Sequence, residues 1–205
     1  MFEQKFEKVA FVGKAAAGKT TAAKYLARSK NFCVVSFADE VRKEATQEYN
    51  LDPYLIFEDY EYKTAHRAEL IDIGNTRRKH DPYYWIKKVS NKILKIYKSG
   101  LYDGVAIDDL GFTNEGIWAW GSGFTIVRIE RPGIADIKEN TRDFEFDDWL
   151  KTTNGAYDII LHNASTIPDF CEKLAMVFLG KKIDLSLFGI DYDREMEACR
   201  NELKG

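Results

Sequence analysis

Short apolar runs, separated by longer stretches of mixed polarity, recur along the chain. The runs are rich in Val, Ile and Phe, which is typical of strands buried on both faces of a parallel sheet. The pattern predicts strands at residues 9–12, 33–37, 104–107, 124–129 and 158–161.

The stretches between these runs predict helices at about 20–29, 39–49, 64–73 and 82–98, and further helices after the third and fifth strands. The apolar positions of residues 82–98 recur at near-helical spacing and predict a core face made of Trp85, Val89, Ile93 and Ile96. Alternating strands and helices indicate a parallel α/β sheet covered on both faces.

Two stretches predict breaks in this regular pattern. Residues 50–63 are rich in Tyr, Asp and Glu and contain Pro53, so they are expected to form an irregular connection. Gly74 and Asn75 predict the end of the helix that begins near Thr64.

Composition and charge narrow the class of protein. The chain has 205 residues and carries 30 Lys and Arg against 33 Asp and Glu, a net charge of −3, which argues against binding long nucleic acid. No stretch approaches the roughly 20 apolar residues of a membrane span, and the start of the chain lacks a signal-peptide pattern. The widely spaced Cys33, Cys171 and Cys199 predict reduced thiols and a cytoplasmic location.

A glycine-rich stretch follows the first predicted strand and precedes a predicted helix. Residues 13–20 match GxxxxGK[ST] at every fixed position, and this context is typical of a loop whose backbone N–H groups cradle a nucleoside triphosphate. Lys19 is expected to reach the terminal phosphates and Thr20 to ligate Mg²⁺. The predicted nucleotide-binding residues here are Gly13, Lys14, Ala15, Ala16, Ala17, Gly18, Lys19, Thr20 and Thr21.

Two acids end the third predicted strand. Enzymes with this loop use an acid on a neighbouring strand to hold Mg²⁺ through water, so Asp108 or Asp109 is expected in that role, and the sequence does not distinguish them. Residues 108–111 also read DxxG, as in GTPases. The NKxD that specifies guanine does not follow, which argues against a GTPase switch.

Further blocks follow the loop in order. They read SFADEVR at 36–42, RAELIDIGN at 67–75 with Arg77, Arg78 and Trp85 beyond it, DLGFTNE at 109–115, RPG at 131–133 and DIILHN at 158–163. With the loop, they resemble the deoxynucleoside monophosphate kinase family of phages and bacteria, over about residues 8–174. The chain departs from that family in having Arg42 for a lysine, Asn75 for a threonine, Gly111 for an arginine and Thr113 for a proline.

The resemblance implies a fold and a domain plan. The fold would be the three-layer P-loop NTPase fold, with a mostly parallel five-stranded sheet and helices on both faces. Residues 1–180 would form the kinase domain, with an acceptor-binding insertion at about 50–100 and a lid-like segment at about 131–155. Residues 181–205 would form a helical C-terminal extension.

The resemblance also implies an activity. The protein would be an ATP- and Mg²⁺-dependent kinase that phosphorylates a small molecule, a deoxynucleoside 5′-monophosphate, to the diphosphate. It would act in the cytoplasm, in that of a host if the gene belongs to a phage, without a membrane or long nucleic acid as partner. The base preference and the formation of a homodimer stay open.

Bringing two phosphates together requires cations around their oxygens, and the arginine fork suits this best. The expected acceptor-binding residues are therefore Arg42, Arg67, Arg77 and Arg78. Asp109 is also expected to contact the acceptor. Arg131 or Arg142 would clamp the transferring phosphoryl group from the lid. Lys19, Arg42, Arg67, Arg131 and Asp39 are the expected catalytic residues.

Three assignments carry a structural alternative. Asp39 either contacts the acceptor sugar or base or only caps a helix, and Trp85 either stacks on the base or lies in the core. Asn163 either touches the donor base or belongs to a plain turn.

Two other functions stay open. A P-loop kinase that phosphorylates a hydroxyl, on a small metabolite or on modified DNA, would need a base near that hydroxyl, such as Asp39 or Asp108. A non-catalytic nucleotide-binding module is the other, and Gly111 in place of the family arginine favours it.

Overall fold

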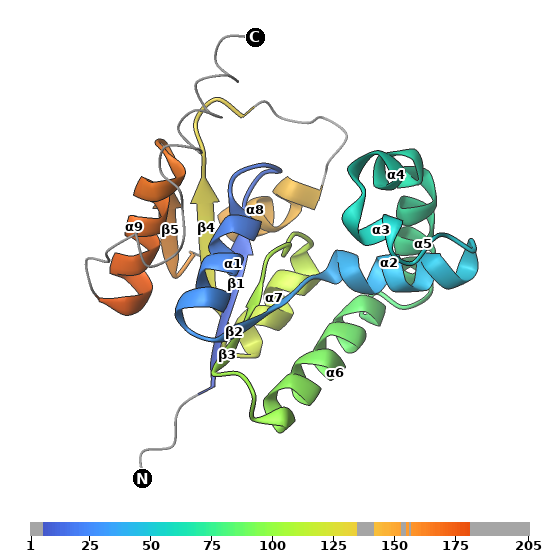
Figure 1. Ribbon diagram of the computed structural model, residues 1–205, viewed down its shortest axis with the longest axis horizontal. Helices are drawn as coiled ribbons and strands as arrows, with labels where there is room; N and C mark the ends of the chain where they lie inside the picture. The colour runs from blue at the N-terminus through green and yellow to red at the C-terminus, as the bar shows by residue number, and fades with distance from the viewer. Residues whose placement is uncertain (1–5, 135–141, 153–154, 156, 181–205) are drawn as a thin grey trace. The chain divides into compact units, whose positions relative to one another are not determined.

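Five parallel strands between Glu7 and His162 form one sheet (Figure 1). The computed structural model describes residues 6–134, 142–152, 155 and 157–180. The strand order is β2-β3-β1-β4-β5, and each neighbouring pair is parallel. The strands are β1 (Glu7–Val12), β2 (Phe32–Val35), β3 (Gly104–Ile107), β4 (Thr125–Glu130) and β5 (Ile159–His162).

The central position of β1 determines where the site can form. Val9 pairs with Ala106 of β3 on one side and with Thr125 of β4 on the other. Because all strands run in one direction, the segments that follow them emerge at the same edge of the sheet. The glycine-rich loop after β1 therefore lies beside the acids that follow β3.

Helices cover both faces of the sheet. The alternate β1 side chains Ala10 and Val12 belong to a core shared with α6 (Tyr84–Ser99), α7 (Thr113–Gly121) and α8 (Arg142–Thr152). The opposite face is contacted by α1 (Lys19–Ser29), whose buried residues are Ala22, Ala23, Tyr25 and Leu26. The three-layer α/β fold expected from the sequence is confirmed.

A group of helices between β2 and β3 has a small core of its own. It comprises α2 (Phe37–Glu48), α3 (Leu55–Glu58), α4 (Tyr60–Ala65) and α5 (Arg67–His80), which gather on one side of the sheet in Figure 1. Their shared buried residues are Ala45, Leu51, Ile56 and Ile73.

The structure corrects three expected boundaries. β2 ends at Val35, and Phe37, predicted to end the strand, begins α2. The connection predicted to be irregular contains α3 and α4. α5 continues through Gly74, which is buried inside the helix rather than ending it.

The C-terminal part begins after Asn163, which ends the first of two compact units. In the second unit, α9 (Ile167–Leu179) is capped by Thr166, whose hydroxyl accepts the N–H of Asp169. The predicted helical extension at 181–205 and the middle of the predicted lid, 135–141, lie outside the described residues. Across the described ranges, none of the helices has the length and apolar character needed to cross a membrane.

Candidate active site

The loop between β1 and α1 has the backbone shape of a phosphate cradle. Gly13, Ala16 and Gly18 all have positive φ, at 140°, 60° and 109°. Such a conformation turns backbone N–H groups toward one anion, and the N-terminus of α1 adds partial positive charge. A Cβ on Gly13 would also collide with the carbonyl oxygen of Ile129, so this position requires glycine.

Three side chains hold this loop from different elements. Lys19 Nζ donates to the carbonyl oxygens of Gly13 and Lys14, the latter at 2.8 Å. Arg131, just after β4, donates from Nη1 to the Ala16 carbonyl at 3.2 Å, and Asn163, just after β5, donates from Nδ2 to the Ala17 carbonyl at 2.9 Å. The loop is therefore supported from the ends of two strands.

Asp108 and Thr20 meet at the edge of the sheet. Thr20 Oγ1 donates to Asp108 Oδ2 at 2.8 Å, and the second oxygen, Oδ1, is buried without a hydrogen-bond partner among the described residues. Burial, together with the negative charge of Asp109, raises the pKa of Asp108 to about 6. A hydroxyl beside an under-satisfied carboxylate fits the oxygen ligands that Mg²⁺ prefers.

Asp109 does something different from its neighbour. Its carboxylate accepts the backbone N–H groups of Phe37 and Ala38, both at 2.8 Å, and the Ser36 hydroxyl at 2.9 Å. These donors lie at the start of α2, where a carboxylate is stabilised by the helix N-terminus. The two acids therefore have different partners. Asp108 bonds Thr20 beside the loop, whereas Asp109 fixes the start of α2 to the end of β3.

A cavity of about 600 Å³ opens between the loop and the helices that follow β2. Lys19 lies in its wall on the loop side. Five cations line it: Lys19, Arg42, Lys63, Arg67 and Arg78. Among the described lining residues Asp109 is the one acid, and both of its oxygens already accept donors from the start of α2.

Arg42 and Arg67 reach the cavity from α2 and α5. Arg42 donates to Asp39 Oδ1 at 2.8 Å, its guanidinium lies 5.7 Å from the centre of the Phe57 ring, and its Nε is buried without a partner in the described part of the chain. Arg67 is exposed at the start of α5 and pairs with no carboxylate of the described residues. Arg42 is thus held in place, whereas Arg67 is free to meet an anion.

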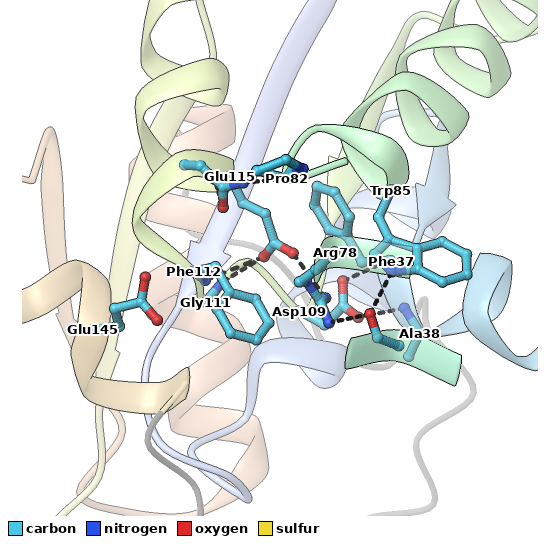
Figure 2. A network of polar contacts seen from close by, with 12 residues as sticks. Phe37, Ala38, Arg78, Pro82, Trp85, Asp109, Gly111, Phe112, Glu115 and Glu145 are labelled. Carbon is cyan, nitrogen blue, oxygen red and sulfur yellow. Dashed lines mark hydrogen bonds and ion pairs between the residues drawn. The ribbon is translucent and has the colours of Figure 1, made fainter. Parts of the chain in front are cut away.

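Arg78 is held by a network that Figure 2 shows from close by. Its Nη1 donates to the Gly74 carbonyl at 3.3 Å, the same oxygen that accepts the Trp85 indole N–H at 3.0 Å. Its guanidinium lies 4.0 Å from the centre of the Phe112 ring, and Nη2 is 3.4 Å from Glu115 Oε1.

Other predicted residues lie elsewhere. Trp85 is 1% exposed, so its ring is unavailable to a base, and of its two alternatives the place in the core is the one the structure supports. Arg77 pairs with Glu44 and Glu48 and does not line the cavity. Asp39 pairs with Arg42 and likewise does not line it.

Asn163, predicted to contact the donor base or to belong to a plain turn, instead bonds the phosphate loop. The residue is 8% exposed and its amide N–H is directed to the loop carbonyl described above. Thr21 lies in the first turn of α1, and Ala15 lines the cavity.

Some residues of the cavity wall were not anticipated. Lys63, Tyr60 and Phe112 line the cavity, and Glu115 lies behind Arg78. Lys63 lies near the end of α4 and Arg67 begins α5, and the irregular connection expected at residues 50–63 gave no reason to place Lys63 on a helix. Nothing in the sequence pairs Glu115 with Arg78, because the two are 37 positions apart.

Comparisons with known proteins concern the sequence and the fold of the chain. A family model described as phosphomevalonate kinase matches residues 11–110. A protein of Acanthamoeba polyphaga mimivirus named "Putative deoxynucleotide monophosphate kinase" is 27% identical over 194 residues, covering 81% of this chain and 93% of the relative. The latter similarity supports a nucleotide-kinase-like protein. The expected phage or bacterial type is not supported, because the relative comes from a mimivirus.

One solved structure supports the same fold. The dephospho-CoA kinase from Campylobacter jejuni is 16% identical with a TM-score of 0.51, over 86% of this chain and 97% of that one. The shikimate kinase from Aquifex aeolicus is 17% identical with a TM-score of 0.41, over 84% and 96%. The chain has the α/β fold of P-loop kinases, and the sequence similarities support a phosphotransferase.

Proposed function

We propose that the protein transfers the γ-phosphoryl group of ATP to the phosphate of a deoxynucleoside 5′-monophosphate, giving the diphosphate in a Mg²⁺-dependent reaction. The observation that carries the proposal is the cavity that begins at Lys19 and is lined by Arg42, Arg67 and Arg78. The mimivirus relative, which bears the name of such an enzyme, supports the same acceptor class.

The size and walls of the cavity suit a nucleotide. Small-molecule sites usually have volumes of about 300–1,000 Å³, and this cavity of about 600 Å³ lies within that range. Phe37, Tyr60 and Phe112 offer aromatic surface for a base, and Val41 and Leu110 add apolar surface. The cations would face the phosphate and the apolar residues the nucleoside.

The distribution of charge favours a phosphate acceptor over a hydroxyl. A hydroxyl acceptor needs a base to take its proton, whereas a phosphate monoester is already largely ionised near neutral pH. Asp109, the acid of the cavity wall, is already bonded to the start of α2, and Asp39 is paired with Arg42 outside the wall. Asp108, the other acid that could act as such a base, does not line the cavity and accepts the Thr20 hydroxyl beside the loop. Cations in the wall, with these acids bonded elsewhere, match the needs of phosphoryl transfer between two anions.

The donor side would hold ATP and Mg²⁺. The loop backbone and Lys19 would bind the triphosphate, while Thr20 and Asp108 would hold the metal, Asp108 partly through water. When bound, the metal supplies positive charge that neutralises the phosphates. The chain's own part is to place Lys19 between donor and acceptor, with Arg131 beside the loop, and to exclude water from the cavity.

The test is an ADP-release assay with a panel of acceptors. Deoxynucleoside 5′-monophosphates, the corresponding nucleosides and phosphomevalonate would each be offered with Mg-ATP. We expect turnover with at least one deoxynucleoside monophosphate and none with nucleosides. Phosphorylation of a nucleoside hydroxyl, turnover of phosphomevalonate alone, or ATP binding without transfer to any acceptor would refute the proposal.

A further inference from the structure

Glu115 is a buried carboxylate behind the cavity wall. Its side chain is 2% exposed. Oε2 accepts the backbone N–H groups of Gly111 and Phe112, both at 3.2 Å, and Oε1 lies 3.4 Å from Arg78 Nη2. One carboxylate therefore joins the start of α7 to a side chain of α5 that lines the cavity (Figure 2).

Arg78 is restrained on three sides by this arrangement. The Gly74 carbonyl accepts from Nη1, the centre of the Phe112 ring lies 4.0 Å from the guanidinium carbon, and Glu115 accepts from Nη2. Glu115 also bonds the backbone of the residue that carries that ring. Glu115 therefore contacts both Arg78 and the backbone of the residue whose ring packs on Arg78.

We infer that Glu115 is a positioning residue for the acceptor, which holds Arg78 in the orientation that binds the acceptor phosphate. The inference rests on the proposed function. Glu115 does not line the cavity, so it acts through Arg78 rather than on the substrate. A long arginine side chain that is ordered before the substrate arrives loses less conformational entropy on binding, and so binds more tightly.

The neighbouring arginine provides a matched comparison. Arg77 lies on the same helix and forms the same kind of pair, with Nε 3.0 Å from Glu44 Oε2. That pair does not line the cavity. Removing the negative charge of Glu44 should therefore leave acceptor binding unchanged, whereas removing that of Glu115 should weaken it.

The first experiment compares Glu115→Gln with Glu44→Gln. Glutamine keeps the length and one oxygen to accept the N–H groups of Gly111 and Phe112, but its NH₂ group cannot accept from Arg78. In ADP-release kinetics with the monophosphate that the wild-type protein uses best, we expect Glu115→Gln to raise the acceptor KM about tenfold, with the ATP KM within about twofold of wild type. Glu44→Gln should change neither.

A double-mutant cycle with Arg78→Lys tests whether Glu115 acts through Arg78. If it does, Glu115→Gln will raise the acceptor KM much less in the Arg78→Lys protein than in the wild type. An unchanged acceptor KM in Glu115→Gln, an equal rise in both KM values, or full additivity with Arg78→Lys would overturn the inference.

Two further readings separate the ways of failing. If thermal melting shows that Glu115→Gln is unfolded, the acceptor KM of Arg78→Lys is the deciding measurement. An acceptor KM equal to that of the wild type would show that Arg78 does not bind the acceptor, so Glu115 could not act through it, and the inference would be refuted. A wild-type protein that phosphorylates no monophosphate would refute the proposed function. A wild-type enzyme that is active, with a Glu115→Gln variant that behaves like Glu44→Gln, would refute this inference alone.

Discussion

The donor side and the acceptor side of the site are built in different ways. The donor side is a run of consecutive residues, 13–20, whose backbone has an unusual conformation and is braced by Lys19, Arg131 and Asn163. The acceptor side gathers side chains from α2, α4, α5 and the segment after β3. Substitutions on the donor side should impair all turnover, whereas those on the acceptor side should affect one substrate selectively.

The largest expected effect is on the donor side. Lys19→Ala removes the ammonium group that lies between loop and cavity, and kcat should fall by about a thousandfold because positioning and charge neutralisation dominate phosphoryl transfer. Steady-state ADP release measures it. Lys24→Ala is the control, since Lys24 is exposed further along α1. Equal activity of the two variants would contradict the role of the loop.

Asp108→Asn should lower kcat by about a hundredfold and raise the Mg²⁺ concentration needed for half-maximal activity, because the metal loses an anionic partner. Asp109→Asn is the comparison, and it should mainly lower the melting temperature, because Asp109 binds the start of α2. Mg²⁺ titrations and melting curves for both variants separate the two acids. A raised Mg²⁺ requirement in Asp109→Asn and not in Asp108→Asn would reverse the assignment.

Asp108→Asn should also change stability in a predictable direction. The pKa of Asp108 is raised to about 6, so its ionised form is disfavoured in the folded protein and its contribution to stability falls as the pH rises from about 4 to 6. At pH 7 without nucleotide and Mg²⁺, the free energy of unfolding of Asp108→Asn should therefore be about 1–2 kcal/mol higher than that of the wild type. Thermal melting at pH 5 and pH 7 checks this, and the gain should shrink at pH 5.

On the acceptor side, Arg67→Ala should raise the acceptor KM by about ten- to a hundredfold and leave the ATP KM nearly unchanged, since Arg67 lines the cavity without an ion-pair partner in the described part of the chain. Arg77→Ala, on the same helix but outside the cavity, should leave both KM values unchanged. Matching kinetics in the two variants would show that the cavity does not bind the acceptor.

The smallest effect is expected at the buried tryptophan. Trp85→Phe removes the N–H donated to the Gly74 carbonyl and some buried area, so unfolding should cost about 1–2 kcal/mol less, with unchanged kinetics. Trp120→Phe, at a residue 59% exposed, is the control and should be nearly neutral. A raised acceptor KM in Trp85→Phe would restore the stacking role that its burial excludes.

The strands and the phosphate loop were predictable because their signals are local. The apolar run at Val9–Val12 and the glycines around Lys19 lie within one short window, and strand, loop and helix follow in order. The course of α5 was not predictable in this way. Gly74 normally signals a helix end, but here it is buried in a continuous helix and its carbonyl accepts two side-chain donors.

The acceptor side could be predicted only by residue type. Arg42, Arg67 and Arg78, which were expected to bind the acceptor, line the cavity, but Arg77, adjacent in sequence, pairs with Glu44 instead. Adjacent helical residues differ by about 100° in direction, and only the packing of α5 against α2 decides which one faces inward. Glu115 and Asp109 gain their roles from partners far along the chain, which no local pattern encodes.

The most direct test of the account is a crystal structure of the protein with a non-hydrolysable ATP analogue, Mg²⁺ and a deoxynucleoside 5′-monophosphate. The account predicts the monophosphate in the cavity, with its phosphate within hydrogen-bond distance of Arg42, Arg67 and Arg78 and facing Lys19. A monophosphate bound elsewhere, or an empty cavity at saturating concentrations, would contradict it.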